Sequence, residues 1–332
     1  MRTNLLAFLF SLLIMPFAKA QFAPQVGVPG STAIHKTSSL IKSWATECTI
    51  RRGFQNIADK SLGYTLLGDS TNVLGIADGE IVSLGDSGIA TIKFRQPIFN
   101  GDGADFAVFE NGFQNPANPE EAFLELAFVA VSSDGENFFT FPTTSNTPSS
   151  TQIKGVGEYM NARLINNFAG KYIGQNGTPF DLEELKSTPG LDVNNISHIR
   201  IIDVIGAISG HTSSDHLGQI INDPYPTPFS TGGFDLDAVA AINITGTNLN
   251  EIKISDANIF PNPASAKVFV TLKSESIIES EIVLTDLAGK IILRQKAEKS
   301  TEINISDFMP GLYFIGISNS TGIQWIGKCS KI

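Results

Sequence analysis

The sequence predicts an all-β protein built from two β-sandwiches. Short apolar runs recur about every ten residues, separated by glycine, proline, asparagine and aspartate, and this spacing is typical of sandwiches. Long segments with a helical period are absent from the sequence. The chain of 332 residues is also long enough for two domains. We expect the larger domain to be a jelly-roll-like sandwich and the smaller one to be immunoglobulin-like.

The first twenty residues predict a signal peptide. Arg2 supplies a short basic segment, an apolar core covers residues 5–17, and Ala18-Lys19-Ala20 is a small-x-small cleavage site. Gln21 is then the first residue of the mature chain. The apolar core is too short to span a bilayer, and no other stretch is long and apolar enough. We therefore expect residues 1–20 to be removed and no transmembrane segment to remain.

The larger domain is expected over residues 21–248, followed by a linker at residues 249–256. Its strands show apolar alternation or continuous apolar runs bounded by turn residues, and the clearest are 81–84, 89–94, 105–109, 124–132, 138–141, 196–204 and 237–244. Ser133-Asp134-Gly135 predicts a hairpin turn between two of them. Residues 180–186, which follow Thr178-Pro179, predict one or two helical turns.

The smaller domain is expected over residues 257–332. Its predicted strands have the same alternating pattern and cover residues 268–272, 281–285, 290–294, 303–305, 311–317 and 323–326. Asp286-Leu287-Ala288-Gly289-Lys290 supplies a turn in which Gly289 can take a positive φ angle. Pro310-Gly311 marks a second turn.

Three motifs in this smaller domain carry a resemblance to a known family. They are Ile259-Phe260-Pro261-Asn262-Pro263-Ala264-Ser265, Leu284-Thr285-Asp286-Leu287-Ala288-Gly289-Lys290 and Pro310-Gly311-Leu312-Tyr313-Phe314-Ile315. In this order they resemble the type A C-terminal sorting domain of the type IX secretion system of Bacteroidetes. The resemblance implies that the type IX machinery is a partner. It also implies a secreted protein, at the outer-membrane surface or extracellular.

Two motifs in the larger domain carry a second resemblance. Asp105-Phe106-Ala107-Val108-Phe109-Glu110-Asn111 comes early, and Gly232-Gly233-Phe234-Asp235-Leu236-Asp237-Ala238-Val239 comes near the end. Together with the Val131-Ser132-Ser133-Asp134-Gly135 turn they resemble an uncharacterised family of bacterial cell-surface proteins. The resemblance implies a modular extracellular domain, and it supplies no activity.

Charge is distributed unevenly along the chain. Residues 21–250 hold 24 acidic and 12 basic residues, a net charge of −12, whereas residues 254–332 hold eight of each. A domain this acidic is repelled by phosphate backbones, so we expect no nucleic-acid partner. Cys48 and Cys329 lie in different domains, so the sequence predicts no disulfide framework.

Several carboxylates of the larger domain predict a calcium site. Acidic residues are depleted from strands, and a buried carboxylate needs a hydrogen-bonding partner, a counter-charge or a metal. Asp235 and Asp237 are spaced to share one strand face, and Glu110-Asn111 ends another strand. These four side chains offer the oxygen ligands that calcium prefers, and a structural calcium ion is the cofactor we expect. Surface turns and ordinary salt bridges are the alternative interpretation.

Other residues are candidates for a ligand site or a catalytic site. Tyr159, Tyr172 and Tyr225 lie in glycine-, proline- or asparagine-rich surroundings and are candidates for stacking on a ligand, whereas core packing is favoured for Phe113 and Phe229. His211 and His216 lack the spacing of a zinc protease and indicate a polar loop. The sequence contains no Gly-x-Ser-x-Gly elbow, phosphate loop or Cys-x-x-Cys pair, so we predict no catalytic residue.

The function expected from these observations is binding or adhesion at the cell surface, with an extracellular glycan or another nutrient as ligand. A polysaccharide hydrolase or lyase is the first alternative, because paired carboxylates can act on glycosidic bonds. A structural role in the cell envelope is the second. A binding protein predicts saturable affinity without turnover, an enzyme predicts product release, and a structural protein predicts neither.

Overall fold

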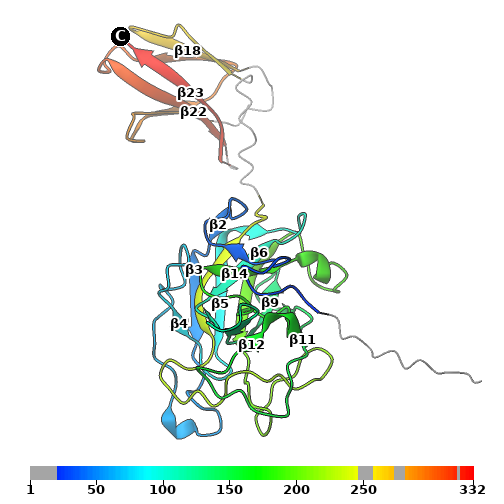
Figure 1. Cartoon of the computed structure of the whole chain (residues 1–332). Coiled ribbons are helices and arrows are strands. Elements are labelled where there is room, and N and C mark those ends of the chain that lie inside the picture. The colour runs from blue at the N-terminus through cyan, green and yellow to red at the C-terminus, as the bar shows by residue number, and fades with distance from the viewer. Residues whose placement is uncertain (1–20, 246–256, 273–280, 320–321) are drawn as a thin grey trace, which may run out of the picture. The chain divides into compact units, whose positions relative to one another are not determined.

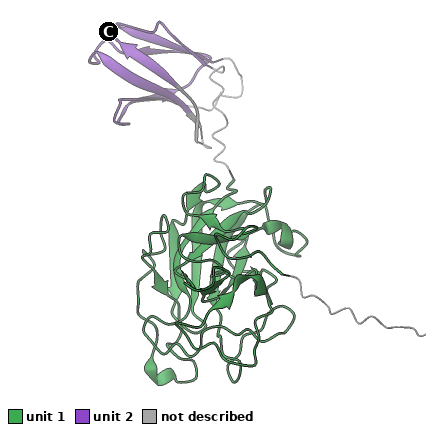
Figure 2. Cartoon of the chain, viewed as in Figure 1, with its two compact units in different colours: residues 1–245 green, residues 246–332 purple. Residues whose placement is uncertain are grey.

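The computed structural model describes residues 21–245, 257–272, 281–319 and 322–332 (Figure 1). The expected signal peptide at residues 1–20 and the expected linker at residues 249–256 lie outside the described residues. The chain divides into two compact units, residues 1–245 and 246–332 (Figure 2). The all-β fold class is confirmed, because the elements are almost entirely strands in antiparallel sheets.

Two sheets form the body of the larger unit. The first has the order β1-β14-β6-β16-β2, with β4 also paired to β16, and its strands are β1 Ile34–His35, β2 Ser43–Trp44, β4 Val82–Ser83, β6 Phe106–Glu110, β14 Asn176–Phe180 and β16 Asp235–Ala241. The second has the order β10-β9-β15-β5-β3, with β3 Glu47–Arg51, β5 Ile89–Ile98, β9 Ala127–Ser132, β10 Phe139–Thr140 and β15 Ile196–Asp203. The longer strands β5, β6, β9, β14, β15 and β16 alternate between the two sheets in chain order, as in a jelly roll.

Short elements complete this unit. They are the strands β7 Phe113–Gln114, β8 Glu121–Phe123, β11 Thr144–Ser145, β12 Met160–Asn161 and β13 Ile165–Asn166, and the 3-10 helices η1 Lys60–Leu62, η2 Ala162–Leu164 and η3 Leu182–Leu185. Helix η3 falls within the helical turn predicted at residues 180–186. It begins after Asp181, whose side chain accepts the N–H of Glu183 and so caps the helix.

The main hydrophobic core lies between the two sheets. Val108 of the first sheet, and Ile92 and Ile201 of the second, belong to one buried cluster. The rings of Phe106 and Phe180 stack with centroids 5.2 Å apart and add to the same cluster. This shared core is what the alternating apolar residues of the sequence predicted.

The first sheet is also covered on its other face. Phe109 and Ala238 belong to a second buried cluster, against which Trp44 packs. Every residue of β6 and β16 is therefore buried. The acidic residues in these strands must find partners inside the protein, because an unpaired buried carboxylate is costly.

Buried acids outside these two strands also have partners, which are mainly groups of the loops. Asp105 precedes β6 and accepts the N–H of Gly101 at 2.8 Å, the N–H of Leu182 at 2.7 Å and the Nδ2 of Asn243 at 2.8 Å. Asp215 accepts three backbone N–H groups in the same way, each at 2.9 Å. Buried carboxylates thus satisfy loop backbone that no sheet can satisfy.

The smaller unit is a second β-sandwich with its own core. One sheet contains β17 Ala257–Phe260, β18 Lys267–Leu272 and β21 Ser300–Asn304, and the other contains β19 Glu281–Thr285, β20 Ile291–Lys296, β22 Gly311–Asn319 and β23 Gly322–Lys331. Val270, Leu284 and Ile315 lie in its core. Within the described part of the chain, no helix has the length and hydropathy that a membrane span requires.

We predict that Asp105→Ala lowers the free energy of unfolding by roughly 2–5 kcal/mol, because it removes the acceptor of two backbone N–H groups and one amide. Asp105→Asn keeps an acceptor oxygen and should cost less. Asp102→Ala, at an exposed position of the same turn, should change the value by less than about 0.5 kcal/mol. Urea unfolding of the mature chain measures all three, and equal losses for Asp105→Ala and Asp102→Ala would contradict the prediction.

Candidate functional site

An acidic pocket of about 260 Å³ opens where loops of the larger unit meet the start of β16. Asn111, Glu125 and Asp235 supply its polar side chains, together with the exposed Lys154. The remaining lining combines apolar side chains with small loop residues: Phe113, Phe123, Gly155, Val156, Pro226, Thr227, Phe229, Thr231 and Gly232. These residues are called the acidic pocket below.

Hydrogen bonds hold the Asp235 carboxylate at the wall of this pocket. Asn111 Nδ2 donates to Asp235 Oδ2 at 3.0 Å, and the Ser83 hydroxyl donates to Oδ1. Asn111 directly follows β6, and Asp235 and Ser83 are paired residues of β16 and β4. The first sheet therefore positions the polar wall of the acidic pocket.

Apolar side chains stand exposed around the same pocket. Phe113 is 42% exposed, Phe229 is 62% exposed and Val156 is 80% exposed. The ring of Phe113 stacks on Phe123 with centroids 5.0 Å apart, which fixes its orientation. Core packing, the interpretation favoured from sequence for Phe113 and Phe229, is therefore wrong. Strand β7 holds the Phe113 ring at the surface, and a loop holds that of Phe229.

The carboxyl groups in and behind the acidic pocket are hard to ionise. Burial raises the pKa of Glu125 well above its ordinary value, and the charges of Asp235 and Glu110 raise it further. Burial raises the pKa of Glu110 in the same way, although the N–H of Gly112 opposes the shift. Burial also raises the pKa of Asp235 to about 6, against the hydrogen bonds from Ser83 and Asn111.

Basic side chains do not neutralise these acids. The ion pairs among the described residues join Glu47, Glu120, Glu183, Glu281 and Glu302 to lysine or arginine, and none of them includes an acid of the pocket. Oε1 of Glu110 is buried and has no hydrogen-bond partner. Ordinary salt bridges, the alternative offered from sequence, do not account for this cluster.

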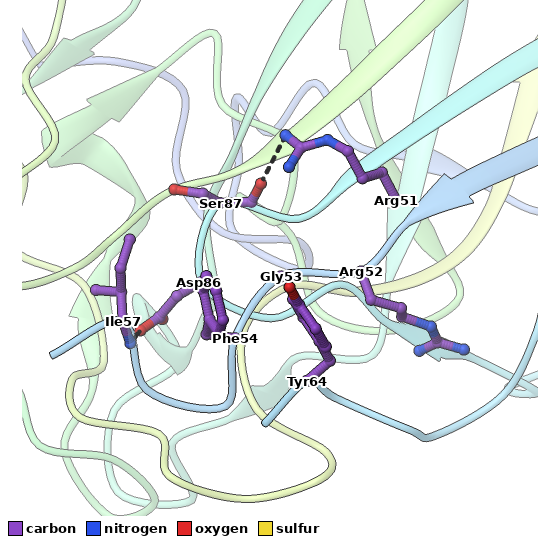
Figure 3. Close-up of a pocket in the computed structure, with 8 residues that line it drawn as sticks. All are labelled: Arg51, Arg52, Gly53, Phe54, Ile57, Tyr64, Asp86 and Ser87. Carbon is purple, nitrogen blue, oxygen red and sulfur yellow. Dashed lines mark hydrogen bonds between the residues drawn. The ribbon is translucent and has the colours of Figure 1, made fainter. Parts of the chain in front are cut away.

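A second pocket, of about 390 Å³, lies at the end of β3 (Figure 3). It is lined by Arg51, Arg52, Gly53, Phe54, Ile57, Tyr64, Asp86 and Ser87, and is called the arginine pocket below. The rings of Phe54 and Tyr64 stack in it with centroids 4.7 Å apart. Arg51 donates to the Ser87 carbonyl at 3.3 Å, whereas the Arg52 guanidinium points away and donates to the carbonyls of Leu67, Gly68 and Ser83.

Asp86 forms the acidic wall of the arginine pocket and belongs to a row of buried acids. Burial raises its pKa to about 6, against the N–H of Ile57 that it accepts at 2.7 Å. Asp203 and Asp223 are also buried, and burial raises the pKa of each well above its ordinary value, with the charge of Asp86 adding to the shift. Asp203 accepts the N–H of Phe234 at 2.7 Å, so this row also anchors the segment that leads into β16.

The structure brings together three of the four side chains predicted to bind calcium. Glu110, Asn111 and Asp235 are neighbours at the paired ends of β6 and β16. Asp237 instead accepts the N–H groups of Asp78 and Gly79, at 3.2 and 3.3 Å, and shares no partner with Asp235. A bulge in β16 between Leu236 and Ala238 interrupts the simple alternation that placed both carboxylates on one face. Within the described ranges, no three or more His, Cys, Asp or Glu side chains are grouped to hold a metal ion.

The three predicted ligand-binding tyrosines line neither pocket. Tyr172 is only 1% exposed, and its hydroxyl lies 2.8 Å from the hydroxyl of Thr32, so it packs in the interior. Tyr225 is half-buried and donates to Asn56 at 3.0 Å. Tyr159 is half-buried. A tyrosine in a glycine-rich segment can lie at the surface or pack in the interior. The composition of the segment does not distinguish these two outcomes.

The comparison with protein families identifies the smaller unit. Residues 258–330 match the family described as "Secretion system C-terminal sorting domain". This match supports export by the type IX machinery, and the protein is therefore exported to the cell surface or the extracellular space. The comparison with curated proteins found no match.

Similar chains among solved structures include those of a β-glucuronidase from Ruminococcus gnavus. Its complex with uronic isofagomine at 1.3 Å resolution is 10% identical, covers 88% of this chain and 44% of that one, and has a TM-score of 0.23. A second structure of that enzyme is 9% identical, covers 88% and 45%, and has a TM-score of 0.22. This chain spans less than half the length of either. We infer no activity from a similarity this low.

We predict that the mature protein melts at a higher temperature at pH 5 than at pH 7.5. The pKa of Asp86 is raised from 3.8 to about 6 in the folded state, so the folded protein binds the proton more tightly than the unfolded chain. The resulting stabilisation is complete below pH 3.8 and is lost as the pH rises through about 6. Asp203 and Asp223 act in the same direction. The charge of His211 lowers the pKa of Asp86 and so opposes the effect.

Differential scanning fluorimetry of wild type, Asp86→Asn and Asp102→Asn checks this pH dependence. Asp86→Asn should reduce the difference in melting temperature between the two pH values. Asp102→Asn, which changes an exposed acid, should leave the difference as it is in wild type. A wild-type protein that melts at a higher temperature at pH 7.5 would contradict the sign.

Proposed function

We propose that this exported protein binds a glycan in the acidic pocket. The observation that carries the proposal is the combination, around one cavity, of hydrogen-bonding side chains with exposed rings. Asn111, Glu125 and Asp235 offer acceptors for sugar hydroxyls, and Phe113 and Phe229 offer apolar faces for stacking on the ring carbons. The cavity of about 260 Å³ fits a short segment of a longer glycan chain better than a large ligand that is enclosed whole.

The charge of the pocket favours a neutral or cationic glycan. The charge of Asp235 raises the pKa of Glu110 and of Glu125, and the charge of Glu110 also raises that of Glu125, so repulsion disfavours additional negative charge in the pocket. An anionic sugar would add to this repulsion, whereas hydroxyl and amino groups donate hydrogen bonds to carboxylates. A neutral or amino-substituted hexose is therefore the ligand class that the pocket fits best.

A polysaccharide hydrolase is the second candidate, and one observation favours it. Glu125 and Asp235 line the same pocket and are equally buried, but burial raises the pKa of Glu125 well above its ordinary value and that of Asp235 only to about 6. Such a difference can assign acid and base roles to two carboxyl groups. In this alternative Glu125, whose pKa burial raises well above its ordinary value, donates the proton. Asp235 acts as nucleophile or base.

We predict that the mature protein retains at least one neutral or amino-substituted glycan on an array, and that Phe229→Ala and Asp235→Asn each weaken its binding about tenfold. Removing a stacked ring or a charged acceptor costs on the order of 1–2 kcal/mol, and 1.4 kcal/mol is a factor of ten. Leu217→Ala, which shortens a 63% exposed side chain outside the pocket, is the matched control and should bind as wild type.

Incubation with the bound glycan separates the two candidates. Binding without catalysis predicts no new reducing ends and no unsaturated products after prolonged incubation. The hydrolase predicts products from wild type and none from Glu125→Gln, with affinity changed by only a few-fold. Unchanged binding by both Phe229→Ala and Asp235→Asn would exclude the acidic pocket under either candidate.

We also propose that Glu110, Asn111 and Asp235 supply ligands to a structural calcium ion beside the pocket. Support comes from the buried Glu110 Oε1, which has no hydrogen-bond partner, and from the 3.0 Å contact that joins Asn111 to Asp235. Two carboxylates and one amide are oxygen ligands of the kind that calcium selects, and backbone carbonyls or water would complete the coordination. Asp237 is omitted, because its oxygen is engaged by Asp78 and Gly79.

We predict that calcium at a hundredfold excess over its Kd stabilises the mature protein by about 2.7 kcal/mol relative to a chelator. Asp235→Ala should abolish this difference, because it removes one charged ligand. Asp237→Ala should keep the difference while lowering stability equally in both buffers, since it removes only a backbone acceptor. Melting curves for the three proteins in calcium and in chelator test this, and identical wild-type curves would exclude the ion.

A further inference from the structure

The outward face of the second sheet gathers basic side chains from three strands. Its inward positions, such as Ile92, Ile199 and Ile201, are fully buried, so the alternating positions between them point away from the core. Across β15, β5 and β3 the outward residues form aligned rows. One row pairs His198 with Lys93 and Glu47.

The next rows carry the two arginines of this face. Arg200 pairs with Thr91, which pairs with Thr49, and two residues further along β3 lies Arg51. Arg51, Lys93, His198 and Arg200 are called the basic face below. Their side chains are half-buried or exposed, so a ligand can reach them.

These basic groups influence one another. The charge of Arg51 adds to burial in lowering the pKa of Arg200. Burial, Lys93 and Arg200 lower the pKa of His198, while the charges of Glu47 and Asp134 oppose this shift. Positive charge therefore concentrates on one face of a domain whose overall net charge is −12.

Neither arginine of the basic face is neutralised by the protein. Lys93 pairs with Glu47 at 3.4 Å, but Arg51 and Arg200 form no ion pair with any residue that the structure describes. The Arg200 guanidinium rests 3.4 Å from the centre of the Phe138 ring, and its Nε is buried without a hydrogen-bond partner. Arg51 makes one hydrogen bond, to the Ser87 carbonyl, at the wall of the arginine pocket (Figure 3).

We propose that the basic face binds an acidic polysaccharide, whose carboxylate or sulfate groups pair with Arg51 and Arg200. Guanidinium groups match the planar geometry of oxyanions and form strong charge-assisted hydrogen bonds with them. The hydroxyls of Thr49 and Thr91 lie between the two arginines and can bond sugar hydroxyls. The stacked Phe54 and Tyr64 rings continue the surface beyond Arg51 and can contact a further sugar residue.

Charge complementarity favours this polymer over nucleic acid or a lipid surface. A flexible polysaccharide can place one or two oxyanions on a narrow basic face and turn its neutral parts elsewhere. A duplex or an anionic bilayer presents a continuous array of phosphates, which the surrounding net charge of −12 would repel. The basic face shares no residue with the acidic pocket, so this inference does not depend on the function proposed above.

Binding of the full mature chain to immobilised polygalacturonate, dextran sulfate and uncharged dextran tests the proposal. We expect retention by at least one acidic polymer and not by dextran, with affinity that falls steeply between about 50 and 500 mM salt because the contacts are ionic. Arg51→Gln and Arg200→Gln should each weaken binding about tenfold, and the double variant should abolish it. The stronger polymer identifies carboxylate or sulfate as the preferred group.

Matched variants distinguish binding at the basic face from nonspecific binding to positive charge. Lys42→Gln removes an exposed positive charge that lies outside the basic face and should bind as wild type. Arg51→Gln changes an exposed side chain of an edge strand, so its result holds even if Arg200→Gln unfolds the protein. The proposal is overturned if dextran binds equally well, if Arg51→Gln binds as wild type, or if duplex DNA or phosphatidylglycerol vesicles bind more tightly than both acidic polymers.

Discussion

Buried carboxylates that accept backbone N–H groups are the interaction on which the larger unit depends. Many of its strands are only two residues long, so much of the backbone runs in loops whose polar groups no sheet ladder satisfies. Asp105, Asp203 and Asp215 each bond to at least two separate backbone N–H groups. The cost is the desolvation of the carboxyl group, which the raised pKa values of Asp105 and Asp203 express. Asp105 and Asp203 thus provide both loop order and a dependence of stability on pH.

The acidic pocket follows from this arrangement. Buried acids anchor the loops from the interior. Where a cavity remains between these loops, the acids closest to the surface form part of its wall. Asp235 shows both roles, because Ser83 and Asn111 hold its carboxylate while one side of it borders the cavity. A carboxylate whose only role is to anchor a loop does not need a cavity beside it. The exposed ring of Phe229 at this cavity is the second feature that loop anchoring does not require.

The sequence predicted the fold class and most of the long strands, because alternation of apolar residues depends on local burial alone. It did not predict how strands far apart in the sequence meet. Asp237 was grouped with Asp235 by simple alternation, which the bulge in β16 interrupts. The basic face was likewise not predicted from the sequence. Arg51, Lys93 and Arg200 are separated from one another by more than forty residues, and only strand pairing aligns them. Pairing across a sheet therefore decides which charges form a site, and a single sequence does not reveal it.

The two units of the chain differ in charge and in the sites they carry. The smaller unit holds eight acidic and eight basic residues over positions 254–332, and its residues 258–330 match a sorting domain. The larger unit carries both pockets and nearly all the strongly shifted carboxyl groups. Its two candidate surfaces differ in charge, since Glu125 and Asp235 line the acidic pocket and Arg51, Lys93 and Arg200 lie on the basic face. A polysaccharide with neutral or amino sugars beside acidic ones would satisfy both surfaces, and two weak contacts on one polymer would reinforce each other.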